Sequence, residues 1–178
     1  MKKLLAIISI FTLFNSFSQT ESKVDFDAFE KLVQEVKPHR AARLLTVEYF
    51  NQMSLKNNVV ILDTRSKEMY DAKHIKGAIH LNFSNFTQKN LEALIPSKST
   101  TILIYCNNNF DDDEMYFPTK MYIPPTETPK EELTLALNIP TYINLFGYGY
   151  KNVYELYELV SIFDERVQLE GTEVVQLN

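Results

Sequence analysis

Apolar residues recur at helical spacing near the start of the chain and form uninterrupted runs further on. Phe26, Phe29, Val33 and Val36 lie three or four positions apart, with charged residues between them. This period predicts an amphipathic helix over residues 24–37, which Pro38 is expected to end. We expect the helix to pack on the domain that follows it, because covering a core is the usual role of such a face.

Two continuous apolar runs indicate buried strands. They cover residues 59–62 and 102–105, and both are rich in β-branched side chains. Runs without alternation are typical of strands that are covered on both faces, as in a parallel sheet. Residues 86–95 between them are predicted to form a helix that ends at Pro96. Strand, helix and strand in this order favour an α/β fold with a mostly parallel central sheet flanked by helices.

The remaining pattern predicts shorter elements. Thr46 is placed to cap a short helix at the start of the domain. A helix is expected over Asn138 to Phe146, closed by Gly149 in a left-handed conformation. Further predictions are a strand at 153–156, a helix at 157–163, and a peripheral strand or tail at 167–177.

The segment from 107 to about 130 differs in composition from the rest. It contains three asparagines, an acidic run at 111–114 and several prolines. We expect one long irregular loop here, and loops of this length in compact domains are often functional or mobile.

The first residues have the layout of a secretory signal peptide. Lys2 and Lys3 precede an apolar run over 4–14, and Ser16 and Ser18 provide small residues before a cleavage site. We therefore predict a signal peptide at 1–18 and an exported protein, periplasmic or secreted; an uncleaved membrane anchor is the alternative. The other predicted parts are an N-terminal helix and linker (19–42), the domain (43–165) and a C-terminal strand or tail (166–178).

Charge and cysteine content limit the function. The 178 residues carry a net charge of −5, and removal of the two lysines of the signal peptide changes it to −7. An acidic chain without a basic cluster argues against nucleic acid and anionic membrane surfaces as partners. No membrane span is expected after signal cleavage. Cys106 is the single cysteine, so it is either buried and inert or a reactive thiol.

Several motifs in order resemble the rhodanese-like family. They are Asp63-Thr64-Arg65 after a strand, Tyr70, His74-Ile75-Lys76-Gly77-Ala78, the strand that ends in Cys106, and Gly149-Tyr150-Lys151-Asn152-Val153-Tyr154-Glu155-Leu156. The resemblance covers roughly residues 44–163. It implies a rhodanese-like fold with an extra N-terminal helix.

The resemblance also implies sulfur transfer by Cys106. The thiolate accepts a sulfur atom from a small anionic donor as a persulfide and passes it to a thiol or another nucleophile. Main-chain N–H groups of Asn107, Asn108, Asn109 and Phe110 are expected around the sulfur, and Asn138 is expected to begin the helix that points at it. No cofactor and no metal are implied.

One part of the family pattern is missing. The arginine that usually closes the loop after the cysteine falls on Asp111 when counted from Cys106, and on Leu137 when counted back from Gly149. The acidic run at 111–114 is expected to raise the pKa of a nearby thiol and to repel anions, so ordinary thiosulfate activity should be weak. Lys120 is a candidate replacement for the missing cation.

The other polar candidates have structural interpretations. Asp63 and Arg65 are expected to form a supporting ion pair, and His74 and His80 to take part in packing rather than catalysis. The acidic run lacks the spacing of a calcium loop, so a solvated loop is favoured over a metal site.

Two functions therefore stay open. The first is a sulfurtransferase of the cell envelope that uses Cys106. The second is a rhodanese-like binding module without catalysis, whose long loop contacts an envelope protein or a small ligand. The retained cysteine favours the first function, whereas the missing arginine favours the second.

Overall fold

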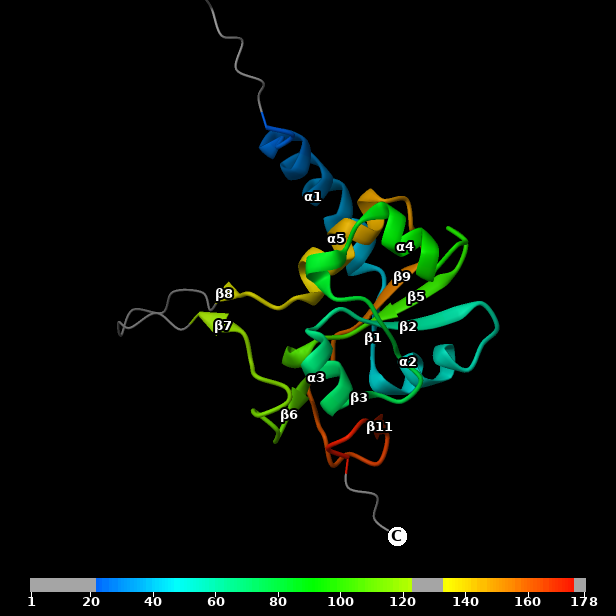
Figure 1. The fold of residues 1–178 in the computed structure, drawn as a ribbon. Helices are drawn as coiled ribbons and strands as arrows, with labels where there is room; N and C mark the ends of the chain where they lie inside the picture. The colour runs from blue at the N-terminus through cyan, green and yellow to red at the C-terminus, as the bar shows by residue number, and fades with distance from the viewer. Residues whose placement is uncertain (1–21, 123–132, 175–178) are drawn as a thin grey trace, which may run out of the picture.

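A parallel sheet forms the centre of the computed structural model, which describes residues 22–122 and 133–174. Its strands run in the order β1, β9, β5, β2, β4, and every neighbouring pair is parallel (Figure 1). Their bounds are β1 (Leu44–Leu45), β2 (Val59–Asp63), β4 (Ile79–His80), β5 (Thr101–Ile104) and β9 (Val153–Leu156). The predicted signal peptide lies outside the described residues.

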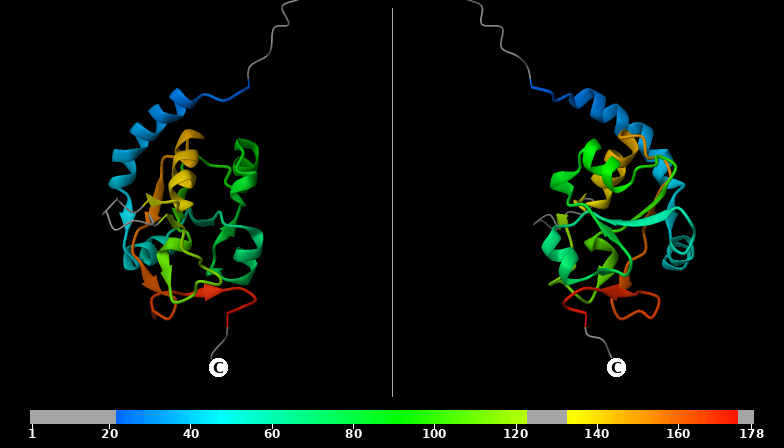
Figure 2. Two further views of the ribbon diagram at one scale, coloured as in Figure 1. Left: turned by 90° about the vertical axis from the view of Figure 1, so that its left-hand side faces the viewer. Right: turned by 45° about the vertical axis from the view of Figure 1, so that its right-hand side comes forward.

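Helices cover both faces of the sheet (Figure 2). One face packs against α1 (Phe26–Ala41), α4 (Gln88–Leu94) and α5 (Asn138–Gly147), and the other against α2 (Val47–Ser54) and α3 (Lys67–Ala72). Successive residues of β5 point to opposite faces of the sheet. Ile102 and Ile104 pack in the core beneath α1, α4 and α5, and Leu103 packs in the core beneath α2 and α3. The predicted α/β fold with flanking helices is confirmed. Within the described residues, no helix has the length and apolar character needed to cross a bilayer.

Helix α1 is longer than the sequence pattern predicts. It begins after Asp25, whose carboxylate accepts the Ala28 N–H at 2.8 Å, and it continues through Pro38 to Ala41. Two contacts of its last turn hold that turn on the domain: His39 Nδ1 lies 2.9 Å from Tyr142 Oη, and Arg40 binds Glu155. The prediction that Pro38 ends the helix was wrong, because these tertiary contacts outweigh the hydrogen bond that proline cannot make.

Two helix ends show how the predicted caps are made. Helix α2 begins after Thr46 as expected, but the threonine side chain makes no capping bond, and Glu158 accepts the Val47 N–H at 2.9 Å instead. Helix α5 ends at Gly147 and is followed after one residue by Gly149, which has a φ of +92°. Its N–H reaches the Phe146 carbonyl at 3.0 Å, and the Tyr150 N–H reaches the Leu145 carbonyl at 2.9 Å. These two hydrogen bonds require a left-handed backbone conformation at residue 149, which glycine adopts without strain.

The segment after β9 is not the predicted helix. Val160 and Ser161 form β10, which pairs in parallel with β6 (Phe110–Asp111). The Asn109 amide donates to the Leu156 carbonyl at 2.8 Å and to the Glu158 carbonyl at 3.3 Å, so the chain stays extended as it leaves the sheet. Pairing with the loop that follows Cys106 therefore overrides the local helical pattern.

The C-terminal segment lies against α3 and the strand after it. Strand β11 (Leu169–Glu170), within the range predicted to be a peripheral strand or tail, pairs antiparallel with β3 (His74–Ile75). Gly171 follows with a φ of +137°, and a Cβ atom there would lie 2.4 Å from the Ala72 carbonyl oxygen. A side chain at this position would push the segment away from α3.

The long segment after Cys106 contains more structure than predicted. It begins with a short 3-10 helix, η2 (Asn107–Asn109), and continues into β6. Further on, β7 (Met121–Tyr122) pairs antiparallel with β8 (Leu133–Thr134), and the pair extends from the body of the molecule (Figure 1). We call residues 120–122 and 133–135 the arm.

Candidate functional site

Cys106 follows β5 at the carboxyl edge of the sheet and is 2 % exposed. By the alternation of the strand, it lies on the same face as Ile104, the face that α1 and α5 cover. Main-chain N–H groups of Asn108 and Asn138 donate hydrogen bonds to its sulfur. Asn138 is the first residue of α5, so the sulfur lies at the positive end of a ten-residue helix.

Several groups set the acidity of this thiol. Burial raises the pKa of Cys106, and this effect is the largest. The two N–H groups lower the pKa, the negative charge of Glu155 raises it, and the positive charge of Arg65 lowers it. The net result is a pKa above the ordinary cysteine value, so the thiol is mostly protonated at neutral pH.

The asparagines after Cys106 organise the loop through their side chains. Asn109 accepts the Cys106 N–H at 2.9 Å, which fixes the turn that starts at the cysteine. Asn108 exchanges two hydrogen bonds of 3.1 Å with the backbone of Lys120, at the base of the arm. Asn107 accepts from Arg65 at 3.4 Å. The loop is therefore tied to β9, to the arm and to Arg65.

Phe110 does not take the role predicted for it. Its N–H donates to the Asn107 carbonyl, and the Asn109 N–H donates to the Cys106 carbonyl at 3.2 Å. The Phe110 ring lies in the core, 5.8 Å from the ring centre of Tyr105 and 4.5 Å from that of Phe117. Of the predicted loop donors, the structure brings the N–H groups of Asn108 and Asn109 to the cysteine side chain, and Asn138, predicted to begin the helix, adds its own N–H.

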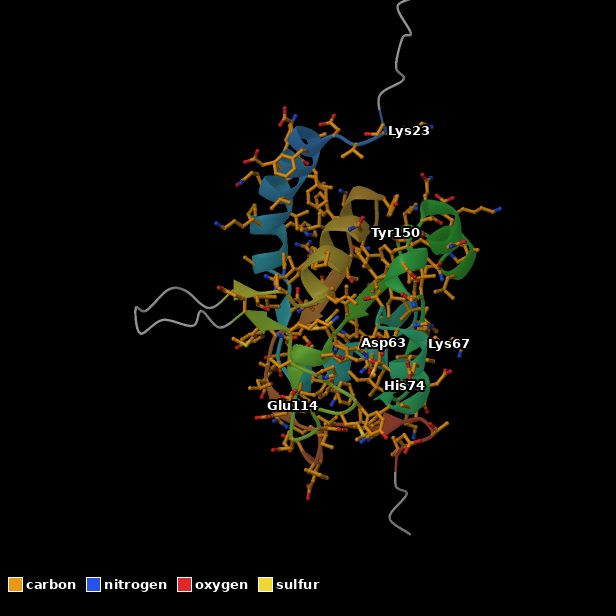
Figure 3. All side chains as sticks on the ribbon, turned by 60° about the vertical axis from the view of Figure 1, so that its left-hand side comes forward. Lys23, Asp63, Lys67, His74, Glu114 and Tyr150 are labelled. Atoms are coloured by element: carbon orange, nitrogen blue, oxygen red, sulfur yellow. The ribbon has the colours of Figure 1, made fainter. Side chains whose placement is uncertain are left out.

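Asp63 and Arg65 form a buried ion pair on the other face of the sheet (Figure 3 labels Asp63). Asp63 is fully buried, and its carboxylate accepts from the Arg65 guanidinium at 2.7 Å and from the Tyr105 hydroxyl at 2.5 Å. Arg65 also donates to the carbonyls of Lys73 and Tyr116, at 2.6 and 3.1 Å. Its charge lowers the pKa of Cys106, but these partners occupy its donors.

A second ion pair, between the partly buried Arg40 and the buried Glu155, was not predicted. Both guanidinium–carboxylate distances are 2.5 Å, and Glu155 is 1 % exposed. The side-chain amide of Asn138 also donates to Glu155. The available signal was a charged residue inside an otherwise apolar strand, which needs a partner when it is buried.

The acidic run at 111–114 is less important for the thiol than predicted. Asp111, Asp112 and Glu114 (labelled in Figure 3) are exposed, and Glu114 accepts hydrogen bonds from Thr119. Asp113 is paired with Lys73 at 2.6 Å. The carboxylate that raises the pKa of Cys106 is Glu155. Lys120 meets the loop through its backbone, and the residue is exposed.

The histidines take part in packing and hydrogen bonding. His74 lies 2.6 Å from the Tyr70 carbonyl and 3.2 Å from Glu170, and His80 lies 2.9 Å from the Arg65 carbonyl. Both rings stack on Tyr70. Among the described residues, no three His, Cys, Asp or Glu side chains are grouped to hold a metal ion.

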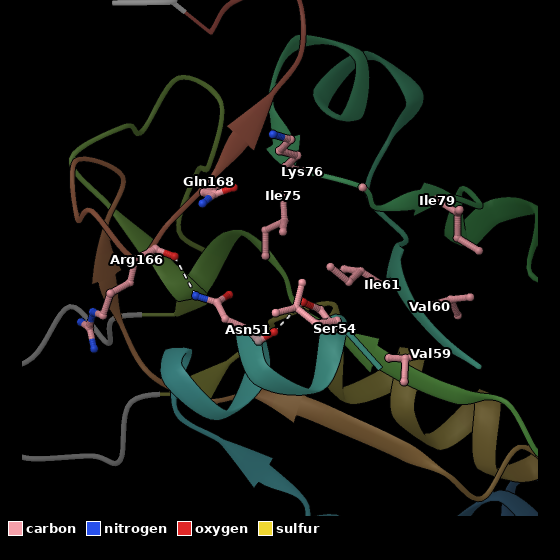
Figure 4. A pocket seen from close by; sticks show the side chains of 12 residues that line it. Asn51, Ser54, Val59, Val60, Ile61, Ile75, Lys76, Ile79, Arg166 and Gln168 are labelled. Carbon is pink, nitrogen blue, oxygen red and sulfur yellow. Dashed lines mark hydrogen bonds between the residues drawn. The ribbon is translucent and has the colours of Figure 1, made fainter. Parts of the chain in front are cut away.

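A cavity of about 530 Å³ lies apart from Cys106, between α2, β2 and the C-terminal segment (Figure 4). Its apolar wall comes from Leu55, Val59, Val60, Ile61, Ile75 and Ile79. Cys106 is not among the residues that line the cavity.

Comparison with solved structures and curated proteins found several similar chains. A protein from Bacillus halodurans, BH2092, aligns with a TM-score of 0.48 and 18 % identity over 83 % of this chain and 86 % of its own. A rhodanese with anions from E. coli aligns with a TM-score of 0.38 and 17 % identity, over 64 % of this chain and 98 % of its own. An uncharacterized protein of Buchnera aphidicola subsp. Schizaphis graminum is 37 % identical over 60 residues, which are 33 % of this chain. That alignment spans 41 % of the relative's length.

The sequence also matches the model of a protein family. The model of the rhodanese-like domain matches residues 46–157, which is more than half of the chain. The match contains β2, β5 and β9, the loop after Cys106, and the buried Asp63–Arg65 pair. Helix α1 and strand β11 lie outside it. The chain therefore belongs to the rhodanese-like domain family.

Proposed function

We propose that this chain is an exported sulfurtransferase that accepts a sulfur atom on Cys106 as a persulfide. The observation that carries the proposal is the pair of main-chain N–H groups, from Asn108 and Asn138, that bind the Cys106 sulfur at the start of α5. Such donors stabilise negative charge on a thiolate and on a persulfide. A cysteine that merely filled space in the core would not require them.

The proposed reaction has two steps. The Cys106 thiolate attacks the outer sulfur of the donor, and a new S–S bond forms. With thiosulfate, the old S–S bond breaks and sulfite leaves with the electron pair; with 3-mercaptopyruvate, the C–S bond breaks and the carbon takes the thiol proton to give pyruvate. A nucleophilic acceptor then attacks the outer sulfur of the persulfide and releases the Cys106 thiolate.

The charges around the site favour the less charged donor. Thiosulfate is a dianion, and its binding needs a free cation. Arg65 is 3 % exposed and donates to Asp63, while Arg40 is paired with Glu155. Both cations are neutralised by a carboxylate, so neither attracts a dianion strongly. We expect 3-mercaptopyruvate to be the better donor of the two.

Turnover tests this proposal. With cyanide as acceptor, the chain should form thiocyanate from 3-mercaptopyruvate faster than from thiosulfate, and Cys106→Ala should remove the activity with both donors. Thiocyanate formation that survives in Cys106→Ala would contradict a role of the thiol. Because the chain has one cysteine, no other thiol can replace it.

Export is part of the proposal and rests on the pattern of residues 1–18. Cleavage after Ser18 would give a mature chain that begins at Gln19. N-terminal sequencing of the protein from the envelope fraction should find this start, whereas a chain that retains the apolar run over 4–14 would favour the membrane anchor.

A binding module without catalysis is the second candidate, and the arm favours it. Met121, Tyr122 and Leu135 are 40, 53 and 61 % exposed, which is unusual for apolar side chains so close together. Asn108 ties the arm to the loop that follows Cys106. A partner protein of the envelope that bound the arm would thus contact the site directly. Absence of turnover with both donors would favour this function.

A further inference from the structure

Glu155 is a buried negative charge beside Cys106. It lies on β9 in register with Ile104 of β5, two residues before the cysteine. Side chains of paired residues share one face of a sheet, so Glu155, Ile104 and Cys106 all face α1 and α5. With 1 % exposure, Glu155 is poorly screened by water, and its charge raises the pKa of the thiol.

Arg40 supplies the charge that opposes Glu155. It lies in the last turn of α1, and both arms of its guanidinium reach the carboxylate at 2.5 Å. The hydrogen bond with Glu155 raises the pKa of Arg40 in turn. Helix α1 lies outside residues 46–157, the part of the chain that matches the family. The partner of Glu155 therefore comes from an addition to the domain.

Asn138 connects this ion pair with the sulfur. Its side-chain amide donates to Glu155, and its main-chain N–H donates to Cys106. The amide oxygen of Asn138 is buried and has no hydrogen-bond partner among the described residues. Among these residues, Glu155 is therefore the group that fixes the orientation of the Asn138 side chain. A continuous set of contacts runs from Arg40 through Glu155 and Asn138 to the thiol.

We propose that Arg40 is a positioning residue that sets the reactivity of Cys106, by neutralising Glu155 and so holding the first residue of α5 against the sulfur. The inference rests on the proposed function, in which Cys106 is the sulfur acceptor. Arg40 acts on the thiol through the Glu155 carboxylate and does not touch the donor.

The test is the pH dependence of alkylation of Cys106 by iodoacetamide in charge-changing variants. Arg40→Gln leaves Glu155 unopposed, so the thiol pKa should rise and the rate at a fixed pH near 8 should fall about tenfold, which corresponds to one pKa unit. Glu155→Gln removes the negative charge, so the pKa should fall and the rate should rise about tenfold. The double variant should return close to the rate of the unaltered chain, and Arg40→Lys should keep part of the effect of Arg40.

Arg166→Gln is the matched control. Arg166 also binds carboxylates, those of Glu48, Asp164 and Glu158, but it lies in the C-terminal segment, and its loss should leave the thiol pKa unchanged. Shifts of the Cys106 thiol pKa in opposite directions, upward in Arg40→Gln and downward in Glu155→Gln, support the proposal. Equal acceleration in both variants would mean that they merely loosen the fold, and unchanged pKa values in both would contradict the electrostatic role; either result overturns the proposal.

Alkylation does not require sulfur transfer, so this inference and the proposed function fail separately. A chain without turnover can still show the opposite shifts, and a chain with turnover can lack them. If Arg40→Gln does not fold, Glu155→Gln and the double variant still decide the question. The proposal requires faster alkylation of Cys106 in Glu155→Gln and a return to the rate of the unaltered chain in the double variant.

Discussion

Replacing Asp63 with alanine should lower the free energy of unfolding by about 3–5 kcal/mol, as measured by urea denaturation. Asp63 is fully buried, and it is the carboxylate that pairs with Arg65, which is 3 % exposed. Without it, the guanidinium keeps its charge in a site that water does not reach. The Tyr105 hydroxyl also loses its 2.5 Å acceptor. A buried charge without its partner costs far more than the pair contributes when it is intact.

Asp71→Ala is the matched control for this prediction. Asp71 also forms an ion pair, with Lys67 at 2.7 Å, but the two side chains are 47 and 71 % exposed. Loss of an exposed pair should change the free energy of unfolding by less than about 1 kcal/mol. Similar effects of the two substitutions would show that the interior of the domain does not hold the Asp63–Arg65 pair as the structure describes.

Alkylation of Cys106 in the folded chain should be slow at neutral pH and should accelerate toward alkaline pH. Burial raises the pKa of the thiol above the ordinary value of about 8.5, and only the thiolate reacts. Below the pKa, the rate should therefore rise about tenfold for each pH unit. At pH 7 it should be below the rate of the unfolded chain, which has an ordinary thiol. Turnover should follow the same rise with pH.

The chain unfolded in guanidinium chloride is the control, because it contains the same cysteine without its surroundings. Its alkylation rate should level off at a lower pH than that of the folded chain. A folded-chain rate that is already constant between pH 7 and pH 8 would mean a depressed thiol pKa, and the balance of burial, N–H groups and charges described for the site would be wrong.

The sequence predicts the sheet well, because its strands are marked by local pattern. Strands β2, β5 and β9 are short apolar runs, and helix α5 has both a clear apolar face and Gly149 at its end. The errors occur where contacts between distant segments decide. Helix α1 continues through Pro38 because Arg40 and His39 are bound by the domain, and the predicted helix at 157–163 is replaced by β10 because β6 offers a partner strand.

The same division applies to the site. The position of Cys106 at the end of a buried strand and the start of α5 at Asn138 follow from pattern and resemblance. The electrostatic environment does not, because it depends on which charges the fold brings together. The acidic run at 111–114 is close to Cys106 in the sequence, whereas Arg40 and Glu155 are far from it in the sequence and next to each other in the fold. Only a three-dimensional arrangement shows that Glu155 is the carboxylate that acts on the thiol.

Intact-mass analysis after incubation with a sulfur donor tests the central claim most directly. The chain without residues 1–18 is treated with 3-mercaptopyruvate, and in parallel with thiosulfate, and its mass is measured before and after reduction. We predict a gain of one sulfur atom that reduction removes and that Cys106→Ala does not show. A chain that folds, whose thiol can be alkylated at alkaline pH, and that gains no sulfur from either donor would contradict the account.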